Sequence, residues 1–106
     1  MKIRISEDFK VAYKRLKKRH KSLEEDFERL LGTLLQNPMQ GVEIEDGVRK
    51  IRLAITSKGR GKSGGARVII RVRFTADELQ LLYIYDKSDY ENISDSFLRD
   101  VLKRLE

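Results

Sequence analysis

Residues 66–87 read ARVIIRVRFTADELQLLYIYDK, and this stretch decides the fold. Its first half alternates apolar residues with arginines, which is typical of a strand with one buried face. Its second half, residues 79–85, is apolar on both faces and indicates an inner strand of a sheet. A tight turn at Ala76-Asp77 joins the two strands and places Arg67 opposite Asp86. We therefore predict an antiparallel hairpin.

The residues before this hairpin continue the alternating pattern. Residues 42–44 and 50–55 each alternate apolar and polar side chains. The dipeptide Asp46-Gly47 between them favours a hairpin turn. Together with the hairpin at 66–87, these segments predict a four-stranded antiparallel meander.

Helical patterns lie on both sides of the meander. Ser6 is a helix N-cap followed by acidic residues, and Ser22 with Glu25 has the spacing of a capping box. The second helix ends at Asn37-Pro38, because a residue before proline disfavours helical geometry. Ser94 caps a final helix with an apolar stripe.

The order of these segments defines the fold class. A chain of 106 residues is long enough for one modest core, and residues 2–5 form a further short strand. We predict a single α+β domain over residues 1–106. Its N-terminal strand and helical hairpin pack on a small antiparallel β-sheet, and a C-terminal helix follows.

Positive charge is concentrated in one block of the sequence. The net charge is +6, but residues 49–73 hold nine cations and no carboxylate. These cations, the basic block, are Arg49, Lys50, Arg52, Lys58, Arg60, Lys62, Arg67, Arg71 and Arg73. Such a block favours a polyanion as partner. A solvated strand surface and an acidic partner protein are the alternatives.

The glycine-rich loop KGRGKSGGAR at residues 58–67 lies inside the basic block. Gly61-Lys62-Ser63 resembles the end of a nucleotide-binding P-loop, but the first glycine of that motif is replaced by Thr56. A P-loop also opens a helix, whereas an alternating β pattern follows here. The loop therefore argues against nucleotide hydrolysis.

Three segments converge at one edge of the predicted sheet. They are the loop at residues 58–62, the strand start at Arg67 and the strand end at residues 85–87. Arg52, Arg71 and Arg73 extend this basic surface along the sheet. Tyr85 adjoins the site, where its ring can stack on a base.

These residues have the chemistry for RNA cleavage without a metal. The reaction removes a proton from a 2′-OH and stabilises extra negative charge on phosphorus. Arginine stabilises that charge, and a lysine beside other cations can act as the base. We find no Asp, Glu and His cluster for a metal and expect no cofactor. His20, at the end of the first helix, is expected to be exposed and without a chemical role.

Three motifs carry a family resemblance that covers nearly the whole chain. Residues 62–69 (KSGGARVI), 82–88 (LYIYDKS) and 92–94 (NIS) resemble the RelE/ParE superfamily of toxins, and its RelE/HigB-like branch most closely. The resemblance implies the toxin half of a toxin–antitoxin pair. RelE-type toxins enter the ribosomal A site and cut mRNA, whereas ParE-type toxins poison DNA gyrase.

The resemblance also implies roles for individual residues. Arg67 matches the arginine that stabilises the phosphate, and Lys87 stands where RelE carries an arginine. Lys58, Arg60 and Lys62 supply the basic loop, with Lys62 as a candidate base.

One family position departs from the pattern. The C-terminal tyrosine of RelE proteins falls near Ile93, which has no acid–base chemistry. Tyr85 or Tyr90 can substitute, and we take Tyr85 as the catalytic candidate.

We therefore predict a ribosome-dependent mRNA endoribonuclease that inhibits translation and is held inactive by an antitoxin with a helix-turn-helix DNA-binding domain. A ParE-type gyrase inhibitor and an inactive RNA-binding relative are the alternatives. The chain has no cysteine and no apolar run near the ~20 residues of a membrane span. We expect a cytoplasmic protein without a membrane partner.

Overall fold

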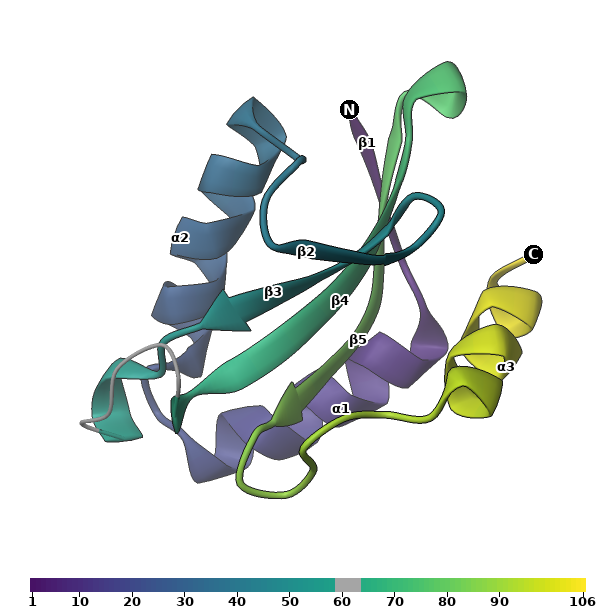
Figure 1. Cartoon of the computed structure of the whole chain (residues 1–106). Coiled ribbons are helices and arrows are strands. Elements are labelled where there is room, and N and C mark those ends of the chain that lie inside the picture. The colour runs from purple at the N-terminus through teal and green to yellow at the C-terminus, as the bar shows by residue number, and fades with distance from the viewer. Residues whose placement is uncertain (59–63) are drawn as a thin grey trace.

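The computed structural model describes residues 1–58 and 64–106 of the chain (Figure 1). Its strands are β1 (Lys2–Ile5), β2 (Val42–Glu45), β3 (Val48–Leu53), β4 (Ala66–Arg73) and β5 (Glu78–Asp86). Its α-helices are α1 (Glu7–Arg19), α2 (Leu23–Gln36) and α3 (Asp95–Leu105), and short 3₁₀ helices lie at η1 (Thr56–Lys58) and η3 (Phe74–Ala76). This order of elements confirms the predicted α+β class.

The strands of the described residues form one sheet in the order β1-β5-β4-β3-β2. β2 to β5 form the predicted antiparallel meander. β1 pairs parallel to β5, with Lys2 opposite Glu78, so the N-terminal strand adds a fifth, parallel strand to the predicted meander and the sheet is mixed. α1 and α2 carry the chain from β1 at one edge of the sheet to β2 at the other edge.

The sheet is covered by helices on both faces (Figure 1). Leu16 of α1 and Leu34 of α2 belong to the buried cluster on one face. Leu98 and Val101 of α3 belong to the cluster on the other face. No helix within residues 1–58 or 64–106 has the length and apolar character to cross a membrane.

The helix caps follow the sequence prediction in two of three places. The hydroxyls of Ser6 and Ser94 each accept a hydrogen bond from a backbone N–H three residues later, as predicted. The predicted capping box at Ser22 is wrong, because the Ser22 hydroxyl makes no cap bond and donates to Asp26 at 2.7 Å instead. Asp26 thereby becomes part of a buried polar contact between α2 and η1.

The connection between β4 and β5 is longer than a tight turn. η3 is followed by Asp77 in the left-handed conformation, with φ 50°. Arg73 therefore lies opposite Glu78, where a tight turn would have placed Thr75.

A β-bulge in β5 then changes the register a second time. Ile69 pairs with Tyr83 and Ile70 pairs with Leu81, so Leu82 is an extra residue on β5. A bulge of this kind is a local feature that a regular alternating pattern does not reveal.

The net result is a register one residue away from the prediction. Arg67 lies opposite Tyr85, and Ala66 lies opposite Asp86, so the predicted pairing of Arg67 with Asp86 was wrong. Because successive residues of a strand point to opposite faces, this difference puts the side chains of Arg67 and Asp86 on opposite faces of the sheet.

Candidate nucleic-acid interface

A groove of about 850 Å³ runs along β3 and is walled by α2, β2 and the segment after β5. Five cations and two carboxylates are among its lining residues: Arg29, Lys50, Arg52, Arg67 and Lys87, with Asp26 and Glu91. Its apolar floor includes Ile51 and Leu53. We call this feature the cationic groove. Its excess of positive charge suits an anionic ligand.

Arg67 is one of the residues that line the cationic groove. Arg52 on β3 and Tyr85 on β5 lie directly opposite it, so the three side chains share one face of the sheet. Arg67 is only 4% exposed, and its Nη1 donates a hydrogen bond to the carbonyl of Ala66 at 3.0 Å. Burial lowers the pKa of Arg67, and the neighbouring Arg52 lowers it further. A bound anion would favour the charged form of this guanidinium.

Tyr85 lies beside Arg67 but within the core. Its ring packs near Tyr83 and Tyr90, with ring centroids 6.3 and 6.2 Å away. Its buried hydroxyl has no hydrogen-bond partner among the residues that the structure describes. Burial raises the pKa of Tyr85, and Arg67 opposes that rise. Tyr85 is not among the residues that line the cationic groove.

Lys87 follows β5 directly and lines the cationic groove with Arg67. Its backbone N–H donates to the carbonyl of Gly65 at 3.0 Å, which joins the end of β5 to the start of β4. Lys50, from the middle of β3, donates to Asn92 at 2.8 Å. These contacts hold the segment after β5 against the sheet.

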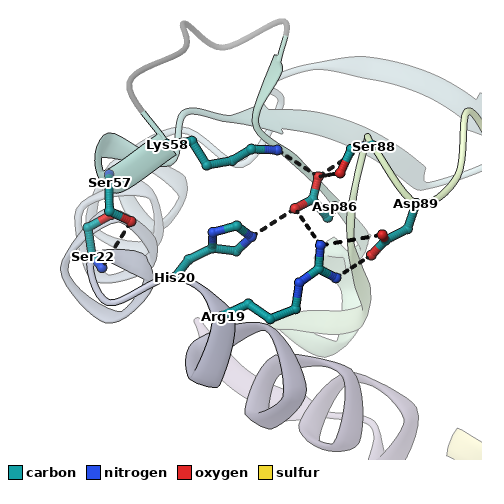
Figure 2. A network of polar contacts seen from close by, with 8 residues as sticks. All are labelled: Arg19, His20, Ser22, Ser57, Lys58, Asp86, Ser88 and Asp89. Carbon is teal, nitrogen blue, oxygen red and sulfur yellow. Dashed lines mark hydrogen bonds and ion pairs between the residues drawn. The ribbon is translucent and has the colours of Figure 1, made fainter.

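Lys58 points to the opposite face of the sheet, where it meets Asp86 (Figure 2). Lys58 Nζ lies 2.8 Å from Asp86 Oδ1, and His20 Nε2 lies 2.8 Å from Asp86 Oδ2. Arg19 and Ser88 complete the contacts of this carboxylate. We call these five residues the Asp86 network.

Asp86 is fully buried, at 0% exposure. Burial alone would raise the pKa of Asp86, but hydrogen bonds from Lys58, Ser88 and His20 outweigh it and hold the pKa well below its usual range. The carboxylate is therefore charged and fully engaged. His20 is mostly buried in this network, so the expectation of an exposed histidine was wrong.

Of the three segments predicted to converge, the structure describes Lys58, Arg67 and residues 85–87, and their side chains lie on two faces of the sheet. Arg67 and Lys87 meet at the cationic groove, whereas Lys58 is engaged with Asp86 behind it. Binding of RNA by Lys58 stays a prediction. Arg60 and Lys62 lie outside the described residues.

Arg71 and Arg73 lie at the far end of β4 from Arg67. Arg71 Nε donates to Gln80 at 2.7 Å, and Arg73 lies opposite Glu78. Burial and the nearby Arg73 lower the pKa of Arg71. A contact of these two arginines with RNA would need a ligand that extends along the sheet.

Two features of the site were missed by the sequence analysis. Asp86-Lys87-Ser88 has an aspartate two residues before a serine, a signal for an Asx-turn, and Ser88 does bind Asp86 through its backbone N–H and hydroxyl. Gly65 approaches β3 so closely that an added Cβ would lie 2.1 Å from the Leu53 carbonyl oxygen. The Asx-turn thus had a signal in the sequence, whereas the long-range approach of Gly65 to β3 leaves no pattern in a single sequence.

Within residues 1–58 and 64–106, no three His, Cys, Asp or Glu side chains gather into a set that would hold a metal ion. The family model described as RelE toxin of RelE / RelB toxin-antitoxin system matches residues 8–104.

Proposed function

The chain belongs to the RelE toxin family, and from this premise we propose that it is a ribosome-dependent endoribonuclease that cuts mRNA. As a member of that family it is the toxin of a toxin–antitoxin pair. The cleavage activity is supported by one observation above the others. A nearly buried arginine, Arg67, lies opposite a second arginine, Arg52, and both line a groove with excess positive charge.

The proposed reaction is attack of a 2′-oxygen on the adjacent phosphorus. The 2′-OH loses its proton to a base, a new P–O bond forms, and the bond to the 5′ oxygen breaks as that oxygen takes up a proton. The products are a 2′,3′-cyclic phosphate and a 5′-hydroxyl end. All bonds are exchanged within the RNA, so the reaction needs neither an oxidant nor a cofactor.

Arg67 is proposed to stabilise the negative charge that develops on phosphorus. Its position in the sheet is fixed by its neighbours on β3 and β5, so little reorganisation is needed when the charge appears. Lys87 would hold the same phosphate from the rim of the cationic groove. Lys62 is the proposed base, and Tyr85 is the proposed source of the proton for the 5′ oxygen.

The remaining cations are proposed to bind the RNA backbone. Arg52 lies directly beside Arg67, and Lys58, Arg60, Arg71 and Arg73 would extend the contact in both directions. The partners of this activity are the ribosome, which presents the mRNA, and an antitoxin, proposed to carry a helix-turn-helix DNA-binding domain.

The test is cleavage of mRNA on purified ribosomes in a single turnover. Parent protein should produce cyclic phosphate ends within translated codons, and naked mRNA should be cut far more slowly. Addition of the antitoxin should abolish cleavage. Intact mRNA together with trapped DNA gyrase would instead support a gyrase inhibitor, and RNA binding without either effect would indicate an inactive relative.

A further inference from the structure

The glycine-rich loop contacts the end of β5 at both of its described ends. Two consecutive residues, Asp86 and Lys87, make these contacts. Lys58 is the first residue of the loop, and its ammonium binds the Asp86 side chain at 2.8 Å. Gly65 lies near the other end of the loop, and its carbonyl accepts a hydrogen bond from the Lys87 backbone N–H at 3.0 Å. The end of β5 therefore joins the two sides of the loop.

Asp86 also orders the turn that carries Lys87. Its Oδ1 accepts hydrogen bonds from the Ser88 backbone N–H and hydroxyl, at 2.9 and 2.7 Å. Its backbone carbonyl accepts from the Asp89 N–H at 2.9 Å. The same residue thus fixes a cation of the basic block and the turn that begins at Lys87, a residue of the cationic groove.

The Asp86 network further ties both features to α1 (Figure 2). His20 and Arg19, at the end of α1, bind Asp86 Oδ2 at 2.8 and 3.4 Å. Arg19 also pairs with Asp89 at 2.6 Å. Because α1 packs on the sheet through its buried stripe, the carboxylate is anchored to a rigid part of the fold.

We propose that Asp86 is a positioning residue for the RNA site: its buried carboxylate fixes Lys58 and the Lys87 turn relative to Arg67. Asp86 itself does not touch RNA, because it is fully buried and points to the face away from Arg67. The assignment to RNA cleavage rests on the proposed function, whereas the control of Lys58 by Asp86 does not.

The experiment compares Asp86→Asn with the parent protein in two independent measurements. The first is the rate at which Lys58 is acylated by a small amine reagent, read by mass spectrometry. The Lys58 side chain is 13% exposed and the Lys10 side chain is 57% exposed. In the parent, Lys58 should react much more slowly than Lys10. In Asp86→Asn, the Lys58 rate should rise about tenfold or more, and the Lys10 rate should not change.

The second measurement separates catalysis from binding on programmed ribosomes. When a group at a reaction site is misplaced by about 1 Å, the rate of the chemical step can fall about 10²-fold. Asp86→Asn should therefore slow single-turnover cleavage about 10- to 100-fold, with less than about a threefold change in ribosome affinity. Ser6→Ala is the matched control, because Ser6 is also buried and polar but caps α1 at the other end of that helix. It should lower stability without changing cleavage or Lys58 acylation.

A second variant keeps the test decisive if Asp86→Asn folds poorly. Lys58→Met removes the positioned cation and leaves Asp86 with its bonds from His20, Arg19 and Ser88. It should fold and should cut more slowly than the parent, and Asp86→Asn should cost less in the Lys58→Met background than in the parent protein. Additive losses would overturn the inference that Asp86 acts through Lys58.

Two other outcomes would overturn the proposal. Unchanged Lys58 acylation in folded Asp86→Asn would show that the carboxylate does not hold Lys58. Faster acylation with cleavage at the parental rate would show that its hold on Lys58 has no bearing on the reaction. If the parent itself cuts no RNA, the proposed function fails, and the acylation rates still decide whether Asp86 controls Lys58.

Discussion

Arg67 on β4 lies directly opposite Tyr85 on β5, on the sheet face that α3 partly covers. The pairing puts a guanidinium with a lowered pKa beside a buried phenol with a raised pKa. Opposed shifts in neighbouring groups are common at functional sites. Substitution of either side chain therefore tests the proposed site.

Replacement of Arg67 should stop catalysis and leave the fold intact. Arg67→Ala should still fold, which circular dichroism and the urea midpoint check. Single-turnover cleavage should fall about 10²- to 10³-fold, the usual cost of losing one preorganised donor. Arg67→Lys should recover little, because an ammonium lacks the planar fork. Arg73→Ala, at the far end of β4, should mainly weaken binding. Parental cleavage by folded Arg67→Ala would remove Arg67 from the mechanism.

Tyr85→Phe should separate stability from catalysis. The Tyr85 hydroxyl has no partner among the described residues, so its removal should not lower the urea midpoint. If that hydroxyl supplies the proton to the 5′ oxygen, cleavage should slow by about 10² or more. Tyr90→Phe, which changes a neighbouring exposed tyrosine, is the matched control and should cut normally. A parental rate for Tyr85→Phe would leave Tyr85 as a core aromatic.

Salt should weaken RNA binding steeply. If the basic surface engages about six phosphates of single-stranded RNA, log affinity should fall against log salt with a slope of roughly −4. Lys87→Ala should reduce the slope by about 0.7, since it removes one phosphate contact from the cationic groove. Fluorescence anisotropy with a labelled oligonucleotide measures both values. A slope near zero would mean that the basic block is only a solvated surface.

Gly65 and Gly32 should respond in opposite directions to the same substitution. A Cβ at Gly65 would lie 2.1 Å from the Leu53 carbonyl oxygen, so Gly65→Ala should destabilise the protein and separate β4 from β3. A Cβ at Gly32, inside α2, would meet nothing within 4 Å. Gly32→Ala should therefore stabilise the fold by about 1 kcal/mol through helix propensity. Urea unfolding of the two variants checks both signs, and a stable Gly65→Ala would refute the close approach.

Acid should destabilise the protein through its buried carboxylates. Hydrogen bonds lower the pKa of Asp86 and, through Thr56 and Ser22, that of Asp26, although burial acts in the opposite direction in both cases. A folded-state pKa below the unfolded value of about 3.9 stabilises the protein above that pH. This stability is lost as pH falls below about 4 towards the folded-state pKa.

The measurement is the free energy of unfolding between about pH 5 and pH 2. Asp86→Asn should be less stable than the parent at pH 5 and should lose less stability on acidification. Asp100→Asn, at an exposed position of α3, should follow the parental curve. A parental pH dependence in Asp86→Asn would contradict a lowered pKa at this carboxylate.

Local patterns were enough to predict most of the fold. Alternation identified β3 and β4, a run that is apolar on both faces identified β5, and the serines at positions 6 and 94 marked two helix starts correctly. The register of β4 with β5 was out of reach, because it depends on the 3₁₀ turn at residues 74–76 and on the bulge at Leu82. Neither feature changes the apolar pattern that the sequence displays.

The candidate site was predicted in composition more than in geometry. The sequence identified Arg67 and Lys87, which the structure brings to one groove. It missed that Lys58 is engaged with Asp86 on the opposite face, because a one-residue difference in register exchanges the two faces of a strand. The contact of His20 was missed because its partner, Asp86, is distant in the sequence.

The parallel pairing of β1 with β5 has a consequence for biosynthesis. Lys2 pairs with Glu78, a residue that is translated long after it. Pairings between such distant segments form late, because a long loop must close before they contribute stability. The sheet therefore cannot be completed while β5 is still inside the exit tunnel. The site around Arg67 therefore takes its final form only after β5 has emerged from the ribosome.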